Sequence, residues 1–251
     1  MALIDLKFYS ESLGVQTSVY VIIPQKSAKG EIGIDGASNE EKYKCLYLLH
    51  GLSDDHTIWL RRTSVERYAA KYGICVVMPY GGRSYYTDMK YGEKYFTYIT
   101  EELPKRICEF FNVSDKREDN YIAGLSMGGY GALKAALRKP EKYCAVAGMS
   151  SVADIRRKGM EEVLKPIFGE NIEIPNEEDL FYLAEKTDKN ELKPRVYMCV
   201  GLGDFLYEDN IRLKEKFESL DYDFTYVESP GTHNWEFWDE YIKYVLAWML
   251  N

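Results

Sequence analysis

The chain has no long apolar run and no excess of positive charge. No stretch of its 251 residues approaches the roughly 20 consecutive apolar residues that span a bilayer. Lys and Arg number 32 against 40 Asp and Glu, which gives a formal net charge of -8. Because an acidic chain repels phosphate backbones and anionic lipid, we expect neither a nucleic acid nor a membrane as a partner.

We expect neither a secretion signal nor paired cysteines. Residues 1–7 lack the basic start and apolar run of a signal peptide. The cysteines form no C-x-x-C pair, and four of the five lie in apolar runs typical of buried, reduced thiols. The five are Cys45, Cys75, Cys108, Cys144 and Cys199. These features predict a cytoplasmic protein.

The pattern of apolar residues predicts an α/β architecture. Short β-rich runs predict strands at residues 2–9, 15–23, 43–49, 74–78, 120–123, 143–147, 196–200 and 224–227. Apolar spacings of three and four predict helices at residues 63–72, 95–111, 127–138, 208–220 and 235–250. Because strands and helices alternate along the chain, we expect a mostly parallel central sheet with helices on both faces.

The length predicts one domain, residues 1–251, because it suffices for one large core and is short for two. Residues 25–42 are rich in Lys, Gly, Glu, Ser and Asn and predict a surface loop. Residues 152–190 are charged and partly helical, and we expect them to form a cap-like insertion over the strand ends. Whether the chain forms homo-oligomers is left open.

A serine lies in a motif typical of hydrolases. Residues 124–128 read Gly-Leu-Ser-Met-Gly and fit G-x-S-x-G, which chance produces about 0.1 times in a chain this long. The motif follows a predicted strand and opens a predicted helix, as a nucleophile elbow does. This context predicts that Ser126 is a nucleophile. The alternative is a helix cap flanked by packing glycines.

A base and an acid follow the serine in the order that this arrangement requires, which is serine, then Asp or Glu, then His. His233 is the only histidine after Ser126, and it lies in a loop after the predicted strand 224–227. Asp204 comes just past the predicted strand 196–200 and is the expected acid. Asp209 is the second choice because it falls within the next predicted helix, and the alternative role for Asp204 is a helix N-cap.

Ester hydrolysis also needs donors for the negative charge that develops on the carbonyl oxygen. One backbone N–H is expected from the residue after the serine, Met127, and the other from the loop after an early strand, where Leu52 is the candidate.

A metal site is one interpretation of residues 50–56, where two histidines flank two aspartates. These residues are His50, Asp54, Asp55 and His56. Their spacing matches no known ligand pattern, and serine chemistry needs no metal, so we expect neither a metal nor another cofactor.

Several segments resemble the esterase D-like group of α/β-hydrolases, which includes tributyrin esterases, feruloyl and acetyl-xylan esterases and S-formylglutathione hydrolases. The matching segments are 47–53, 77–79, 124–133 (GLSMGGYGAL), 203–204 and 231–235. The resemblance implies an α/β-hydrolase fold, catalytic residues at Ser126, Asp204 and His233, and oxyanion donors at Leu52 and Met127.

The subgroup follows from finer features. The segment 85–88, the tyrosine at position 130 and the short chain look closer to tributyrin and feruloyl esterases than to S-formylglutathione hydrolases. Five aromatic residues are candidates for an acyl pocket, with packing in the core or on the surface as the alternative for each: Trp59, Tyr85, Tyr86, Phe205 and Trp235. We also expect Phe181 and Tyr182, in the 152–190 segment, to help set substrate choice.

The sequence therefore predicts a serine carboxylic ester hydrolase that acts on a small-molecule ester with a short acyl or hydroxycinnamoyl group, through an acyl-enzyme. One alternative is a thioesterase for S-formylglutathione. Another is a hydrolase fold retained as a non-catalytic binding protein, against which the intact set of Ser126, Asp204 and His233 argues. Acyl transfer to a sugar is a less favoured option.

Overall fold

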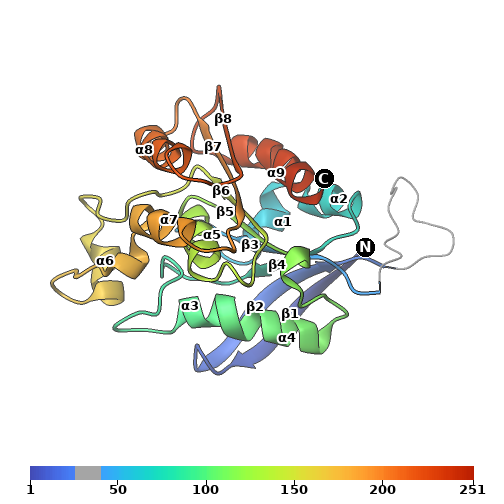
Figure 1. Ribbon diagram of the computed structural model, residues 1–251. Helices are drawn as coiled ribbons and strands as arrows, with labels where there is room; N and C mark the ends of the chain where they lie inside the picture. Colours follow the sequence, from blue (N-terminus) through green and yellow to red (C-terminus); the bar gives the residue numbers. More distant parts are fainter. Residues whose placement is uncertain (26–40) are drawn as a thin grey trace.

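The computed structural model describes residues 1–25 and 41–251, which contain one eight-stranded sheet (Figure 1). The predicted loop 25–42 lies almost entirely outside the described residues. The strands are β1 (Ala2–Ser10), β2 (Val15–Ile23), β3 (Cys45–Leu49), β4 (Cys75–Pro79), β5 (Asn120–Leu125), β6 (Ala145–Met149), β7 (Arg195–Gly201) and β8 (Phe224–Ser229).

The sheet has the order β1-β2-β4-β3-β5-β6-β7-β8, and the prediction of a mostly parallel sheet is confirmed. The first two strands form an antiparallel hairpin, and β2 pairs antiparallel with β4. All pairs from β4 to β8 are parallel. Every residue of β3, β4, β5 and β6 is buried, because both faces of these strands are covered, and this is why they read as continuous apolar runs.

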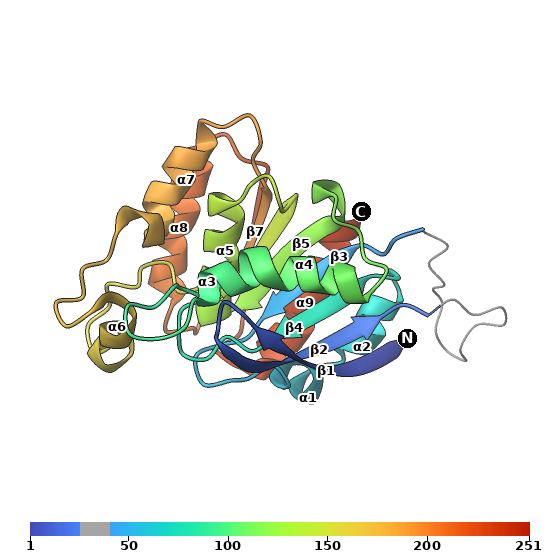
Figure 2. The same cartoon turned by 90° about the horizontal axis from the view of Figure 1, so that it is seen from below.

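Helices cover both faces, as predicted (Figures 1 and 2). One face packs against α1 (Ile58–Arg62), α2 (Val65–Ala70) and α9 (Trp235–Leu250). The apolar core on the other face includes side chains from α3 (Tyr95–Thr97), η1 (Tyr98–Glu102), α4 (Leu103–Phe110), α5 (Met127–Arg138), α7 (Leu180–Asp188) and α8 (Tyr207–Glu218), and α6 (Glu161–Phe168) adjoins it at the outer side. Two short 3-10 turns complete the elements, η2 (Arg117–Asp119) and η3 (Asn176–Glu178).

Two predicted helices differ from those in the structure. The helix expected at 63–72 is shorter, α2, and a separate helix that was not predicted, α1, precedes it. The two are separated because Thr63 is extended and its hydroxyl donates to the Trp59 carbonyl at 2.5 Å. The N–H of Ser64 donates to Asp239 Oδ1 at 3.0 Å instead of continuing a helix. The helix expected at 95–111 contains the π-helical turn η1 between α3 and α4.

The connection from β6 to β7 carries α6, η3 and α7, and so includes the 152–190 segment. Its second helix packs against α5, where the Thr187 hydroxyl donates to the Leu137 carbonyl at 2.7 Å. Figure 1 shows α6 at the outer side of the molecule beside α7. Because the strands are parallel, the loops after β5, β7 and β8 leave the same edge of the sheet.

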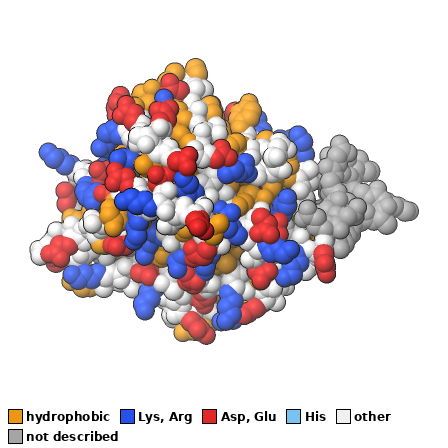
Figure 3. All heavy atoms as spheres, viewed as in Figure 1, with side chains coloured by type: hydrophobic (Ala, Val, Ile, Leu, Met, Phe, Trp, Pro, Cys, Tyr) orange, Lys and Arg blue, Asp and Glu red, His pale blue; other side chains and the backbone are white. Residues whose placement is uncertain are grey.

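The surface of the described residues shows no single-sign field on the face drawn in Figure 3, where Lys and Arg are interspersed with Asp and Glu. Among these residues, no helix is both long enough and apolar enough to cross a membrane.

Candidate active site

Ser126 lies on a sharp turn between β5 and α5. Its backbone has φ 52° and ψ -118°, a left-handed conformation that an L-residue with a side chain adopts only under strain. The turn brings chain segments together so closely that side chains are excluded on both sides of it. A Cβ on Gly124 would lie 2.3 Å from the Gly128 carbonyl oxygen, and one on Gly128 would lie 2.5 Å from the Leu49 carbonyl oxygen. The two glycines of the motif are therefore required by this geometry.

Three predicted site residues meet at the carboxyl edge of the sheet. The Nε2 atom of His233, in the loop after β8, lies 3.0 Å from Ser126 Oγ. Its Nδ1 atom lies 3.0 Å and 2.9 Å from the two carboxylate oxygens of Asp204, in the loop after β7. The result is a continuous hydrogen-bonded chain from hydroxyl to imidazole to carboxylate.

The environment of Asp204 keeps its carboxylate ionised. Its side chain has no exposed area. Burial by itself raises the pKa of Asp204, but hydrogen bonds from His233 and from the Leu206 N–H, the latter at 2.8 Å, outweigh this and leave the pKa below its usual value. Asp209, the second choice, is instead paired with Arg212 at 2.7 Å on the first turns of α8.

Two aromatic rings hold the imidazole in place. The ring of Trp238 lies edge-on to His233 at 4.9 Å between centroids, and its indole N–H donates to Ser150 Oγ at 3.1 Å. The ring of Phe205 covers His233 at 4.4 Å. Only 16% of the His233 side chain is exposed, so the imidazole faces the serine with little contact to water.

The two predicted oxyanion donors lie beside the serine. Neither the Met127 N–H, at the start of α5, nor the Leu52 N–H donates a hydrogen bond to another residue in 1–25 or 41–251. Met127 directly follows Ser126 in the chain, and Leu52 lines the same cavity as Ser126. The helix dipole at Met127 also favours negative charge there.

The loop that carries Leu52 is held by His50. The Nδ1 atom of this histidine lies 2.7 Å from the Gly51 carbonyl oxygen, and its Nε2 atom accepts the Gly81 N–H at 2.9 Å. This pattern requires the neutral tautomer with the proton on Nδ1. Burial lowers the pKa of His50 to about 4, which keeps the ring neutral at pH 7.

The residues considered for a metal do not converge. Both ring nitrogens of His50 are engaged by the backbone, and the His56 ring packs edge-on against Tyr20 at 5.0 Å. Asp55 caps its own turn by accepting from Thr57. Within residues 1–25 and 41–251, no group of three or more His, Cys, Asp or Glu side chains is placed to hold a metal ion.

A cavity of about 680 Å³ opens at Ser126. Three of the five predicted aromatic residues line it: Tyr85, Phe205 and Trp235. The predictions for Trp59 and Tyr86 are wrong, because both are buried in the core and neither lines this cavity. The indole of Trp59 donates to the Leu49 carbonyl at 3.1 Å, and the hydroxyl of Tyr86 donates to the His50 carbonyl at 3.0 Å.

The 152–190 segment reaches the cavity through its first part only. Val152, Arg157 and Met160 line the cavity, whereas Phe181 and Tyr182 do not, so the expectation for those two is wrong. The Phe181 ring lies instead against the Arg212 guanidinium, at 5.8 Å.

Sequence reasoning missed several charged residues of the cavity wall. These are Arg62, Arg157 and Glu236, together with Asp54, which the sequence suggested only as a metal ligand. No spacing or motif distinguishes them from the many surface charges of the chain. The guanidinium of Arg157 lies over the Phe205 ring at 5.4 Å, so one cation is held close to the aromatic wall.

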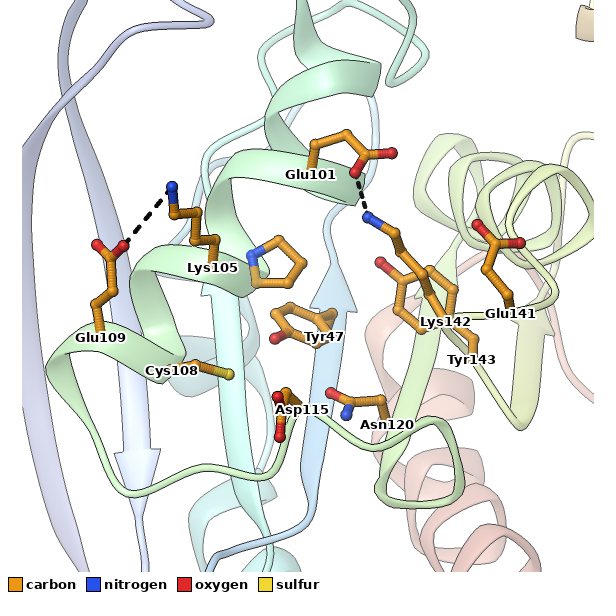
Figure 4. Close-up of a pocket in the computed structure, with 11 residues that line it drawn as sticks. Tyr47, Glu101, Lys105, Cys108, Glu109, Asp115, Asn120, Glu141, Lys142 and Tyr143 are labelled. Carbon is orange, nitrogen blue, oxygen red and sulfur yellow. Dashed lines mark hydrogen bonds and ion pairs between the residues drawn. The ribbon is translucent and has the colours of Figure 1, made fainter.

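A second cavity, of about 430 Å³, lies between α4 and the amino ends of β3 and β5 (Figure 4). It is lined by aromatic and charged side chains, with Tyr47 at its centre and the Glu101–Lys142 ion pair at its rim. None of the predicted site residues lines it. The Tyr47 hydroxyl is buried, so it is not exposed to a ligand in this cavity.

Known proteins are similar to this chain over its whole length. The sequence pattern of the family described as "Putative esterase" matches residues 10–249. An acetyl esterase from Caldicellulosiruptor saccharolyticus is 30% identical over 263 aligned positions, which cover 99% of this chain and 98% of that protein.

Two solved structures from Staphylococcus aureus are also similar. One is the fluorophosphonate-binding serine hydrolase F with bound substrate, which is 32% identical with a TM-score of 0.87 and covers 100% of this chain and 98% of its own. The other is an S-formylglutathione hydrolase without ligand, which is 32% identical with a TM-score of 0.86 and covers 100% of this chain and 99% of its own.

Proposed function

We propose a catalytic triad for this chain, which belongs to that esterase family and is a serine carboxylic ester hydrolase of the α/β-hydrolase fold. Its members are Ser126 as nucleophile, His233 as base and Asp204 as the group that orients the base. The observation that supports this most is the hydrogen-bonded chain of the three side chains at the mouth of a cavity. The alternative of a non-catalytic binding protein is set aside, because the matching family is described as putative esterases and relatives at 30% and 32% identity are an acetyl esterase and a serine hydrolase.

The first half of the reaction makes an acyl-enzyme. His233 Nε2 takes the proton of the Ser126 hydroxyl while Oγ attacks the ester carbonyl carbon. The N–H groups of Met127 and Leu52 donate to the oxyanion of the tetrahedral intermediate. The intermediate collapses, the bond to the alcohol oxygen breaks, and the imidazolium returns its proton to the leaving alcohol.

The second half releases the acid. A water molecule gives its proton to His233 and attacks the acyl carbon, and a second oxyanion forms in the same place. The bond to Ser126 Oγ then breaks, and the serine regains its proton from the imidazolium. Asp204 keeps the Nδ1 proton of His233 in position throughout, so that Nε2 faces the serine in both halves.

The proposed substrates are esters of small molecules with short acyl or hydroxycinnamoyl groups, among them tributyrin and feruloyl esters. The aromatic residues Tyr85, Phe205 and Trp235 in the cavity wall support this, because an aromatic acyl group gains from ring contacts of about 0.5–1.5 kcal/mol per pair. The similarity to an acetyl esterase supports the short-acyl class.

A second candidate is hydrolysis of the thioester S-formylglutathione. It is favoured by the 32% identity to the S-formylglutathione hydrolase from Staphylococcus aureus. A formyl group is the smallest acyl group, so this reaction would use the serine but leave most of the acyl side of the cavity empty.

One experiment tests both candidates. We expect the purified protein to hydrolyse acetyl, butyryl and feruloyl esters with a higher kcat/KM than S-formylglutathione, and the reverse ranking would favour the thioester. Ser126→Ala should keep its thermal unfolding profile and lose on the order of 10⁶ in kcat, as triad nucleophiles do. Activity of that variant within tenfold of the wild type would remove Ser126 from the mechanism.

We also propose a cytoplasmic location. The support is that all five cysteines are free thiols, with Cys45, Cys75 and Cys199 fully buried in the sheet.

A further inference from the structure

A lysine is buried without exposed area in the helix that follows the nucleophile. The ammonium group of Lys134, on α5, donates to the Tyr85 carbonyl at 3.1 Å, to Thr87 Oγ1 at 2.7 Å and to Glu178 Oε2 at 2.6 Å. An ammonium has three N–H groups, and each has a partner here. Three chain segments therefore meet at one buried charge.

Its partner, Glu178, comes from η3 in the β6–β7 connection and is 5% exposed. The other carboxylate oxygen, Oε1, accepts from Arg138 at 3.0 Å. The Tyr130 hydroxyl, also from α5, lies 2.7 Å from the Glu178 carbonyl oxygen. Both the side chain and the backbone of Glu178 are thus tied to the helix that begins at the serine.

The ammonium also acts on a wall of the active-site cavity. Tyr85 lines that cavity, and its backbone has a strained, left-handed φ of 50°. Its carbonyl accepts from Lys134 and from the Thr87 hydroxyl, and its ring packs edge-on against Tyr130 at 5.6 Å. A strained conformation of this kind persists only where neighbouring groups hold it.

A second wall is connected to the same pair. The residue after Glu178, Asp179, caps α7 and forms an ion pair with Arg156 at 2.8 Å. Arg156 adjoins Arg157, which lines the cavity. The stretch of the β6–β7 connection that faces the substrate is therefore anchored next to the buried carboxylate.

A contribution to the stability of the fold does not by itself explain a buried ion pair such as Lys134–Glu178. Removing two charges from water costs several kcal/mol per ion, and apolar residues of similar volume often stabilise a fold as well or better. A role in placing the cavity walls gives a reason for the charges.

We propose that Lys134 and Glu178 are positioning residues that set which acyl groups the cavity accepts, by holding Tyr85 and the β6–β7 wall against α5. This rests on the proposed function, in which Ser126 attacks an ester in that cavity. Neither residue takes part in proton transfer, so the pair determines the fit of the acyl group and leaves the chemistry of the triad unchanged.

The test compares acyl groups of increasing size on one alcohol. The double variant Lys134→Met with Glu178→Gln removes both charges and keeps similar volumes. We expect the ratio of kcat/KM for p-nitrophenyl butyrate to that for p-nitrophenyl acetate to change by about fivefold or more, mainly through KM, because a displaced wall alters apolar contacts worth that much. The kcat for the acetate should stay within about fivefold of the wild type.

Two other variants separate positioning from general loss of structure. Lys139→Met is the matched control. Lys139 lies at the end of the same helix, and its ion pair with Glu101 is on the surface, so this variant should leave the ratio unchanged. Thr87→Val removes one hydroxyl of the network at nearly constant volume and should shift the ratio in the same direction by a smaller factor. It serves in place of the double variant if that one does not fold.

The outcomes are distinct. Equal losses on both esters, or an unchanged ratio in the folded variants, would overturn the positioning role. If the proposed function is wrong, Ser126→Ala will still hydrolyse every ester. If only this inference is wrong, ester hydrolysis will still require Ser126.

Discussion

Replacing Asp204 by Asn should nearly abolish turnover without unfolding the protein. The Leu206 N–H, at 2.8 Å from Oδ1, requires an acceptor, so the amide oxygen should stay at that position. The amide NH₂ then takes the place of Oδ2, which lies 2.9 Å from His233 Nδ1. The amide oxygen stays 3.0 Å from Nδ1 but already accepts from Leu206, whereas the NH₂ group can only donate to Nδ1. We therefore expect the imidazole to carry its proton on Nε2, where it points at Ser126 and cannot accept the hydroxyl proton.

The expected loss follows from the wrong tautomer. In serine hydrolases this change costs about 10⁴ in kcat, equivalent to about 5 kcal/mol in the activation barrier. The assay is kcat on p-nitrophenyl acetate near pH 7, beside the thermal unfolding midpoint.

Asp209→Asn is the matched control for this change. Asp209 was the second choice of acid, but it pairs with Arg212 and, at 3.8 Å, with Arg157 of the cavity wall instead of with His233. Its variant can shift that wall but keeps the tautomer of His233, so its kcat should fall by less than about tenfold. A loss below tenfold in Asp204→Asn, or a comparable loss in Asp209→Asn, would refute the assignment of the acid.

Three further outcomes are expected. Burial lowers the pKa of His50 to about 4, so between about pH 6.5 and pH 4 the unfolded chain binds a proton at this residue that the folded chain does not. The free energy of unfolding should therefore fall by about 3 kcal/mol between pH 7 and pH 4. Chemical unfolding should show a smaller fall for His50→Asn. Trp235→Ala should change the ratio of feruloyl to acetyl turnover, whereas Phe181→Ala, outside the cavity, should not; equal effects would contradict the wall assignment. Chelators should leave turnover unchanged, and activity restored by an added metal after chelation would contradict this.

The parts of the site that local patterns determine were predictable from the sequence. The elbow at Ser126 is recognisable from two glycines within five residues, although the second of them makes room for the distant Leu49 carbonyl. Strands buried on both faces give continuous apolar runs, which predicted the parallel sheet, although such runs do not specify the order of the strands within it. His233 followed by elimination, because the chain has three histidines and one lies after the serine.

The remaining features depend on contacts between distant segments. Trp59 and Phe205 are equally aromatic, yet one is buried in the core and the other is 66% exposed beside His233. Nothing in the helical pattern of residues 127–138 distinguishes Lys134 as a buried charge, because its partner Glu178 lies 44 residues away. Burial and pairing of this kind are properties of the assembled layers and not of any single stretch.

The strand order also has a consequence for the kinetics of folding. Ser126 and His233 are 107 residues apart in sequence, and the histidine follows β8, which is the edge strand of the sheet. This strand is held in the sheet by parallel pairing with β7 alone, where Val196 lies opposite Phe224. A chain with a packed centre but an undocked β8 would therefore have secondary structure and a serine, yet no base. Return of ester turnover during refolding should thus report the docking of β8, which the burial of the central strands alone does not provide.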